Sequence, residues 1–155
     1  MTPTARKVVF ANTAILISAL VFTTVCPCGR TPGAFLFVDV VPDSVANWSF
    51  ANDVPLCQLE VRTWRPHSIN LNCMTGADGN LYVSCSSCAG KAWSQTALVT
   101  GEGRIRMDRA VYPVSLRRVT DNEELDKAWA ARLTKLERAP EPRPDHWWSF
   151  HLTSR

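Results

Sequence analysis

The sequence has no cluster of Lys or Arg residues, although these two types number 17 against 14 acidic residues. The net charge is only +3, and charged residues make up 20% of the chain. Proteins that bind nucleic acid present a basic patch or stripe to the phosphates. We therefore expect no nucleic-acid partner.

Other absences narrow the fold and the chemistry. The chain has no internal repeat, and its strands do not alternate with helices as they do in parallel α/β proteins. No Ser, His, Asp order and no pair of carboxylates indicates hydrolysis, so no catalytic residue is assigned. With 155 residues, 46% of them hydrophobic, the chain has the composition of one ordinary globular domain.

Charge is also missing from residues 8–25, which follow Arg6 and Lys7. These 18 residues are long enough for a candidate membrane span. The exit at 23–28 lacks the small residues of a signal-peptidase site, so we favour an uncleaved anchor. A cleaved signal peptide, a lipoprotein site at Cys26 and a buried soluble helix are the alternatives. The two basic residues predict a single-pass protein with its C-terminal domain outside the cytoplasm.

The chain therefore divides into three parts. Residues 1–27 are the hydrophobic anchor or signal segment, residues 28–53 are a connector and membrane-proximal segment, and residues 54–155 are the folded domain. The connector begins with the Pro/Gly-containing run CPCGRTPGA.

Alternating apolar and polar residues in the domain predict short strands. They are expected at 54–62, 67–73, 81–85, 104–107, 110–119 and 147–153. In the first of these, Gln58 and Glu60 are expected on the polar face. Asp78-Gly79 and Asp108-Arg109 indicate hairpin turns. Pro113 indicates a sheet edge or a bulge.

Two helices are expected beside the strands. A short one at 89–98 ends before the glycines at 101 and 103. A longer one begins at a capping box formed by Asp121 and Glu124. Its stripe of Leu125, Ala128, Trp129, Arg132, Leu133 and Leu136 predicts core packing. The pattern favours a mainly β (α+β) fold, a small β-barrel with two flanking helices.

Four cysteines lie in the strand region. A turn at 64–66 would oppose Cys57 and Cys73, with Cβ atoms close to disulfide spacing. A turn across 75–79 would oppose Cys73 and Leu81 and leave Cys85 about 13 Å farther along, at about 3.3 Å per residue. This favours two pairs, Cys57 with Cys73 and Cys85 with Cys88, over one four-cysteine zinc site. Reduced, buried thiols are the alternative for the first pair.

Cys85-Ser86-Ser87-Cys88 is a CxxC motif that leads into the short helix. It lacks the following His of a c-type haem site. A helix N-terminus lowers thiol pKa, so a redox-active pair remains an alternative. The same polar turn, with Lys91 close behind, predicts an anion site at the helix N-terminus.

The order of these features resembles the flavin-binding split barrels of the pyridoxamine 5'-phosphate oxidase-like superfamily. The resemblance lies in HSINLN at 67–72, G-x-LYVS at 79–84, the turn with Lys91, VYPV at 111–114, VTD at 119–121 and W-x-x-x-HL at 147–152. It is spread over about 100 residues without a single strong motif. In the oxidases an Arg often stands where this chain has His151, and their Arg-rich phosphate clamp is not evident here.

The resemblance implies a split barrel that forms a homodimer and binds a flavin at the subunit interface. FMN is the expected cofactor, with deazaflavin or haem as alternatives. The implied phosphate ligands are Ser84, Ser86, Ser87 and Lys91. The residues implied to contact the rest of the flavin are Ser68, Asn70, Asn72, Trp147 and His151. No metal ligand is implied.

We therefore expect a membrane-tethered split-barrel domain that binds a flavin-type cofactor and acts as an oxidoreductase on an unidentified substrate. One alternative is a non-enzymatic, disulfide-braced interaction or accessory module at the membrane. A second is a thiol-redox protein that uses Cys85 and Cys88.

Overall fold

The computed structural model describes residues 13, 36, 40–61 and 67–155. The chain divides into two compact units, residues 1–31 and 32–155, and all elements below belong to the second. Within the described residues, no helix has the length and apolar character needed to cross a membrane. The expected span at 8–25 lies outside the described residues except for Thr13, as does most of the segment before residue 40.

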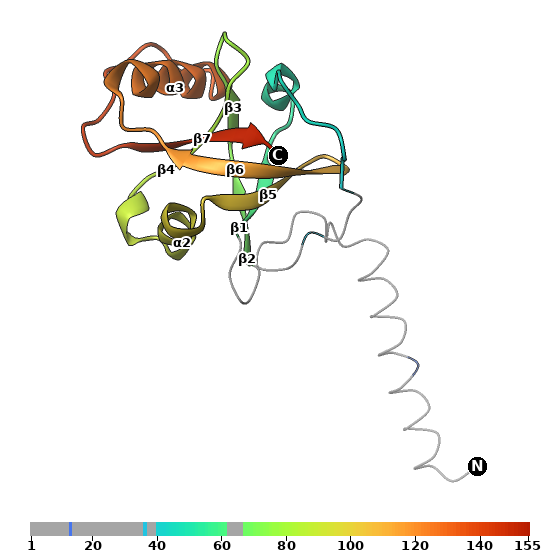
Figure 1. The fold of residues 1–155 in the computed structure, drawn as a ribbon. Coiled ribbons are helices and arrows are strands. Elements are labelled where there is room, and N and C mark those ends of the chain that lie inside the picture. The colour runs from blue at the N-terminus through green and yellow to red at the C-terminus, as the bar shows by residue number, and fades with distance from the viewer. Residues whose placement is uncertain (1–12, 14–35, 37–39, 62–66) are drawn as a thin grey trace. The chain divides into compact units, whose positions relative to one another are not determined.

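The described part of the second unit contains one sheet of seven strands, in the order β2-β1-β5-β6-β7-β4-β3, with every neighbouring pair antiparallel (Figure 1). The strands are β1 (Cys57–Val61), β2 (His67–Leu71), β3 (Cys73–Thr75), β4 (Leu81–Cys85), β5 (Glu102–Met107), β6 (Ala110–Arg118) and β7 (Trp148–Ser154). The outermost strands, β2 and β3, are separated in sequence only by Asn72. The two ends of the sheet therefore meet, and the sheet curves into a barrel as expected.

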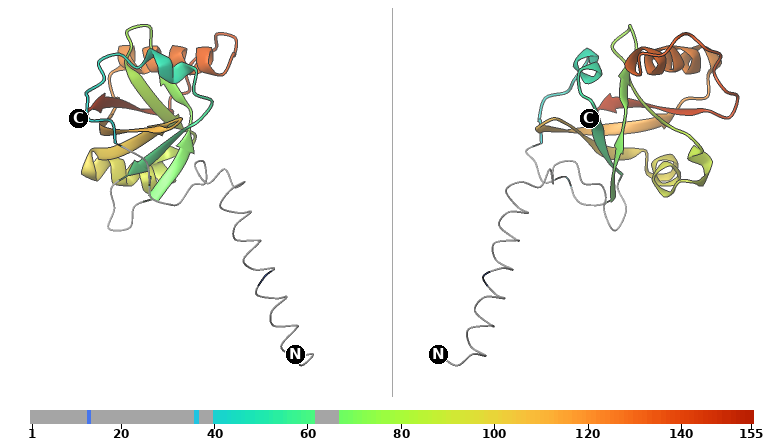
Figure 2. Two further views of the ribbon diagram at one scale, coloured as in Figure 1. Left: turned by 90° about the vertical axis from the view of Figure 1, so that its right-hand side faces the viewer. Right: turned by 180° about the vertical axis from the view of Figure 1, so that it is seen from behind.

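Two α-helices flank the sheet, α2 (Ala92–Thr100) and α3 (Asn122–Lys135), and they lie on different sides of it (Figures 1 and 2). Asp121 begins α3 as predicted, because its carboxylate accepts a hydrogen bond from Glu124 N at 2.9 Å. The predicted helix at 89–98 is instead a 3-10 turn, η3 (Cys88–Gly90), followed by α2. Gly101 ends α2 with a left-handed φ of 62° that favours glycine.

The side chains of β4 alternate between two cores. Leu81, Val83 and Cys85 pack inside the barrel with Phe150 and Leu152 of β7. On its other face, β4 places Tyr82 and Ser84 beneath α3. Tyr82 packs in a second core with residues of that helix, and Ser84 accepts a hydrogen bond from its Arg132. This second core includes Met74, Leu125, Ala128, Trp129, Leu133 and Trp147. The apolar stripe predicted for α3 thus does pack into a core, except at Arg132 and Leu136.

The expected solvent exposure of β1 is wrong. All five of its residues are buried, including Gln58 and Glu60. The Glu60 carboxylate accepts two hydrogen bonds from Arg104 Nη2 at 2.7 and 2.9 Å and one from Leu36 N at 2.8 Å. Neighbouring strands and Leu36 therefore cover a face of β1 that the sequence pattern predicts to be exposed to solvent. The buried Glu60 charge is paired with Arg104.

Both disulfides are present, but the predicted strand registers are wrong. Cys57 pairs with Leu71 across β1 and β2, and Cys73 pairs with Val83 across β3 and β4. The loop between β1 and β2 is thus longer than the three residues expected. The Cys57–Cys73 bond, with a Cα separation of 5.8 Å, joins β1 to the start of β3 just past the Asn72 break. It therefore braces the place where the barrel closes.

Candidate functional site: a basic pocket at the Cys85–Cys88 turn

The residues expected on β2 are not equally accessible. Ser68 is fully buried, and its Oγ accepts a hydrogen bond from Gln58 Nε2 at 2.9 Å. Asn70 and Asn72 are half-buried, and His67 at the start of the strand is exposed. Within one chain, Ser68 therefore contributes to the packing of β1 on β2 and offers no surface to a ligand.

Ser84 lies near the end of β4, buried beneath α3. Its Oγ lies 3.1 Å from Arg132 Nη1, which donates to it, and 3.8 Å from the sulfur of Met74. Because Arg132 lies in the last turn of α3, this hydrogen bond fixes the end of the helix against the strand. It also positions the guanidinium group at the end of β4, where the CxxC turn begins.

The CxxC turn is closed by the Cys85–Cys88 disulfide, with a Cα separation of 5.4 Å. Ser86 and Ser87 are exposed at its tip, and Ser87 has a left-handed φ of 55°. The buried Ser94 hydroxyl donates to Cys88 O, and at 2.8 Å to Lys91 O, which fixes the corner into α2. The two serine side chains therefore sit on a short, braced turn.

A pocket of about 160 Å³ lies beside this turn. We call it the basic pocket, and its lining residues come from the turn, from α3 and from the loop before β7. They are Cys85, Ser86, Ser87, Trp129, Arg132, Arg138, Pro144, His146 and Trp147. Three of the residues expected to bind the cofactor, Ser86, Ser87 and Trp147, thus meet in one place, and no carboxylate is among the described residues that line it.

The electrostatics of the basic pocket favour an anion. Burial lowers the pKa of Arg132, and the charge of Arg138 lowers it further, whereas Glu141 acts in the opposite direction. A lowered pKa here means that the guanidinium lacks the solvation or counter-charge that would stabilise it. Glu141 is itself engaged by Arg138, with nitrogen and oxygen 3.1 Å apart. A bound anion would supply the missing charge.

Trp147, which lines this pocket, has a buried side-chain donor without a partner among the described residues. Its side chain is 8% exposed, and in the described part of the chain its buried Nε1 has no hydrogen-bond partner. Its ring meets Trp129 edge-on, with centroids 5.1 Å apart, and Trp129 Nε1 donates to Glu141 O at 2.7 Å. A buried N–H without a partner is rare and costly, so it calls for an explanation.

The remaining expected residues lie apart from the basic pocket. Lys91 is exposed at the N-cap of α2 and does not line the pocket. His151 Nδ1 lies 3.0 Å from Glu124 Oε1 and 3.0 Å from Arg117 Nη2, with its ring 5.2 Å from that of Tyr82. His151 also lines a different pocket, of about 290 Å³. The structure therefore separates His151 from the serines of the turn.

Sequence reasoning missed Arg132, Arg138 and His146. Arg132 was assigned to the core stripe of α3, yet a charged residue inside an otherwise apolar stripe is itself a signal, because burial of a charge requires a partner. Arg138 follows the end of α3, and no local pattern brings it to the CxxC turn. His146 lies in a proline-rich loop, and only tertiary structure places that loop beside β4.

The geometry suits a compact oxyanion such as a phosphate group. Arginine side chains and serine hydroxyls donate hydrogen bonds, and the guanidinium fork matches phosphate oxygens. A metal ion would need acceptors instead. In the described residues, no group of three or more His, Cys, Asp or Glu side chains is placed to hold a metal.

Comparison with known proteins shows the fold. No protein-family model and no curated protein sequence matches the chain. A solved structure from Bacteroides thetaiotaomicron, a proposed 5-nitroimidazole antibiotic resistance protein, matches 72% of this chain and 82% of its own, with a TM-score of 0.57 and 9% identity. A proposed pyridoxamine 5'-phosphate oxidase from Listeria innocua covers 68% and 88%, with a TM-score of 0.55 and 8% identity.

A NimC/NimA family protein from Clostridium acetobutylicum is also similar, with a TM-score of 0.50 and 11% identity over 68% of this chain and 78% of its own. Identities this low carry the fold and not the activity. The resemblance found in the sequence is thus confirmed at the level of architecture: the chain has the split-barrel fold of the pyridoxamine 5'-phosphate oxidase-like proteins.

Proposed function

We propose that this protein binds a flavin-type cofactor and holds its phosphate group in the basic pocket. The observation that carries the proposal is the meeting of Arg132, Arg138 and the Ser86-Ser87 turn at one pocket. The split-barrel fold supports it, because one solved structure of this fold is a proposed pyridoxamine 5'-phosphate oxidase. FMN, which ends in a phosphate, is the first candidate.

The basic pocket fits only one end of such a cofactor. Its volume of about 160 Å³ is below the roughly 300–1,000 Å³ of pockets that enclose whole ligands. It accommodates a phosphate group, whereas the isoalloxazine ring would lie outside it. Since Ser68 is buried, the half-buried Asn70 of β2 and Asn72, which follows that strand, are the expected residues left to face the ring. We propose that a second copy of the chain covers the ring in a homodimer.

In this proposal the flavin supplies the electron chemistry, and the protein supplies binding and orientation. Arg132 holds the phosphate charge, the serine turn donates hydrogen bonds, and Trp147 excludes water from the inner wall. Oxidation or reduction of an unidentified substrate follows from that cofactor. Thiol-redox chemistry at Cys85 and Cys88 is less well supported, because these side chains are only 9% and 2% exposed and reactive cysteines are accessible.

We further propose that residues 8–25 tether the protein to a membrane and that the barrel lies outside the cytoplasm. The two disulfides support this placement, because such bonds persist in oxidising compartments. They also support the second candidate function, a disulfide-braced interaction module without a cofactor.

The test is an absorbance spectrum of the detergent-extracted full-length protein, with mass spectrometry of any released ligand. A flavin spectrum, or its appearance after FMN is added and excess is removed, is the expected result. A colourless protein that neither retains nor binds FMN would overturn the proposal and favour the interaction module.

A further inference from the structure

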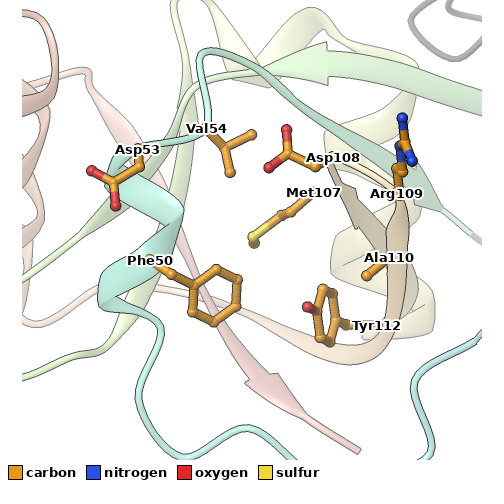
Figure 3. Close-up of a pocket in the computed structure, with 8 residues that line it drawn as sticks. All are labelled: Phe50, Asp53, Val54, Met107, Asp108, Arg109, Ala110 and Tyr112. Atoms are coloured by element: carbon orange, nitrogen blue, oxygen red, sulfur yellow. The ribbon is translucent and has the colours of Figure 1, made fainter.

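A second pocket lies at the tip of the β5–β6 hairpin, beside η2 (Ser49–Asn52), and nothing in the proposed flavin site uses it (Figure 3). Its volume is about 460 Å³, within the usual range for small-molecule sites. We call it the aromatic pocket. The lining residues that matter for its chemistry are Phe50, Val54, Met107, Asp108 and Tyr112.

The walls of the aromatic pocket are two rings. Phe50 and Tyr112 have centroids 5.9 Å apart and planes tilted by 45°, and Figure 3 shows the Met107 side chain reaching the space beside them. Trp48 packs edge-on against Tyr112 at 5.3 Å and fixes its ring from behind. Phe50 is 38% exposed, which is unusual for a large aromatic residue. Ring faces carry negative potential and attract cations.

A carboxylate without a partner lies at the same pocket. The Asp108 side chain forms no hydrogen bond or ion pair in the described part of the chain, whereas Asp53 donates its backbone N–H to Phe50 O at 3.2 Å and its charge favours the protonated form of Lys135. In Figure 3 the Asp108 carboxylate lies beside Val54 and Met107, whereas the Asp53 carboxylate points away from the rings. Asp108 has a left-handed φ of 52° at the tip of the hairpin. The turn thus places one negative charge on the lining of the pocket that the two rings also line, with Met107 between them in Figure 3.

We propose that the aromatic pocket binds a small organic cation of the alkylammonium class. Phe50 and Tyr112 would face its alkyl groups, and Asp108 would balance its charge. Arg109 also lies at the rim, and it opposes cation binding. The ligand must therefore be small enough to stay between the rings and Asp108. A free metabolite and a lipid headgroup share this chemistry, and the test below separates them.

The first probe pair is choline and 3,3-dimethylbutanol, in which a carbon replaces the charged nitrogen without a change of shape. Isotope-labelled full-length protein in maltoside micelles would be titrated with each, and amide shifts at 107–112 would be followed by NMR. Cation–π contacts and the charge of the carboxylate both favour the cation over the neutral alcohol, so we expect choline to bind about tenfold tighter than the alcohol. Equal affinity would overturn the proposal.

Two variants assign the contacts. Asp108→Asn removes the charge and keeps the turn, because Asn tolerates a positive φ; we expect choline affinity to fall about fivefold and alcohol affinity to stay unchanged. Phe50→Leu alters an exposed ring and leaves the fold intact; we expect choline affinity to fall several-fold. Asp43→Asn, an exposed carboxylate outside this pocket, is the matched control. Unchanged choline binding in both pocket variants would contradict the assignment.

Vesicles decide the source of the cation. The full-length protein would be reconstituted in phosphatidylcholine vesicles and in phosphatidylglycerol vesicles and titrated with choline; a weaker apparent choline affinity in phosphatidylcholine, a difference lost in Asp108→Asn, would identify a lipid headgroup. Binding of free choline with equal affinity in both kinds of vesicle would identify a soluble ligand. Absence of both would overturn the proposal.

Discussion

The basic pocket and the aromatic pocket belong to the same barrel but differ in the hydrogen-bonding character of their walls. The basic pocket presents donors, namely the guanidinium groups of Arg132 and Arg138 and the hydroxyls of Ser86 and Ser87. The aromatic pocket presents two ring faces and an unpaired carboxylate. Because α3 and the CxxC turn build the first while η2 and the β5–β6 hairpin build the second, the loops around one sheet supply opposite chemistries.

The largest expected effect concerns the donors of the basic pocket. Replacing both arginines in Arg132→Met and Arg138→Met removes every fixed positive charge from its lining. A hydrogen bond to a charged group is worth about 1.5–3 kcal/mol, so we expect FMN affinity to fall at least about 100-fold. Isothermal titration of the full-length protein in detergent measures this.

Lys91→Met is the matched control for that experiment, because it removes a positive charge that the structure places outside the basic pocket. We expect its FMN affinity to stay within about twofold of the parent. A large loss in Lys91→Met together with a small loss in the arginine variant would reverse the assignment. It would indicate that the phosphate binds at the N-terminus of α2 beside Lys91, as the sequence pattern predicts.

The next largest expected effect is the loss of stability on removing a disulfide, which should differ between the two bonds. Cys57 and Cys73 are 16 residues apart, whereas Cys85 and Cys88 are 3 apart. In the chain-entropy model the first bond stabilises the fold by about 3 kcal/mol and the second by less than about 2 kcal/mol. Urea unfolding of Cys57→Ala/Cys73→Ala and Cys85→Ala/Cys88→Ala variants tests the ranking. Equal losses would show that strain or residual structure dominates over loop length.

The Cys85–Cys88 disulfide should also affect FMN binding, which unfolding experiments do not measure. It closes the turn that carries Ser86 and Ser87, so its loss should let both hydroxyls move. Fixing a side chain on binding costs about 0.5–1.5 kcal/mol, and we expect the Cys85→Ala/Cys88→Ala variant to bind FMN about threefold to tenfold more weakly. Choline binding at the aromatic pocket should not change. A parallel loss at both pockets would indicate general loosening of the barrel.

The sequence predicted the barrel better than it predicted the basic pocket. Alternation located six of the seven strands of the described residues and missed β3, and Asp121 located the start of α3, because both signals are local. The strand registers were wrong because the number of loop residues, which alternation does not report, decides whether Cys57 faces Cys73 or Leu71.

The site was predicted in part for the same reason. Ser86 and Ser87 are recognisable as a polar turn before a helix. Arg132 and Arg138 reach that turn only because α3 packs across β4, a contact between residues 48 positions apart in the case of Arg132 and Ser84. Ser68 looks exposed by alternation, and only the packing of β1 against β2 and of Gln58 over its hydroxyl buries it.

The smallest expected effect is a change of stability with pH. It arises from Tyr82 in the core beneath α3, which belongs to neither pocket. Burial raises the pKa of Tyr82, and the charges of Asp78 and Glu124 raise it further. Above about pH 10 the unfolded tyrosine loses its proton while the native one retains it. The native state then binds more protons, so stability falls as the pH rises towards the native pKa, by at most about 1.4 kcal/mol per pH unit.

The titration of Lys135 changes the stability in the opposite direction, so its contribution must be measured separately from that of Tyr82. Burial lowers its pKa, although Asp53 opposes the shift, so the native lysine loses its proton first and stability rises with pH in that window. Tyr82→Phe, which keeps the ring, should flatten the decline in the free energy of unfolding between pH 9.5 and 11, and Lys135→Met should steepen it. These values come from urea titrations at each pH. If Tyr82→Phe left the decline unchanged, the phenol would not titrate within the core, and the alkaline loss would have to arise from the exposed charges around the pockets.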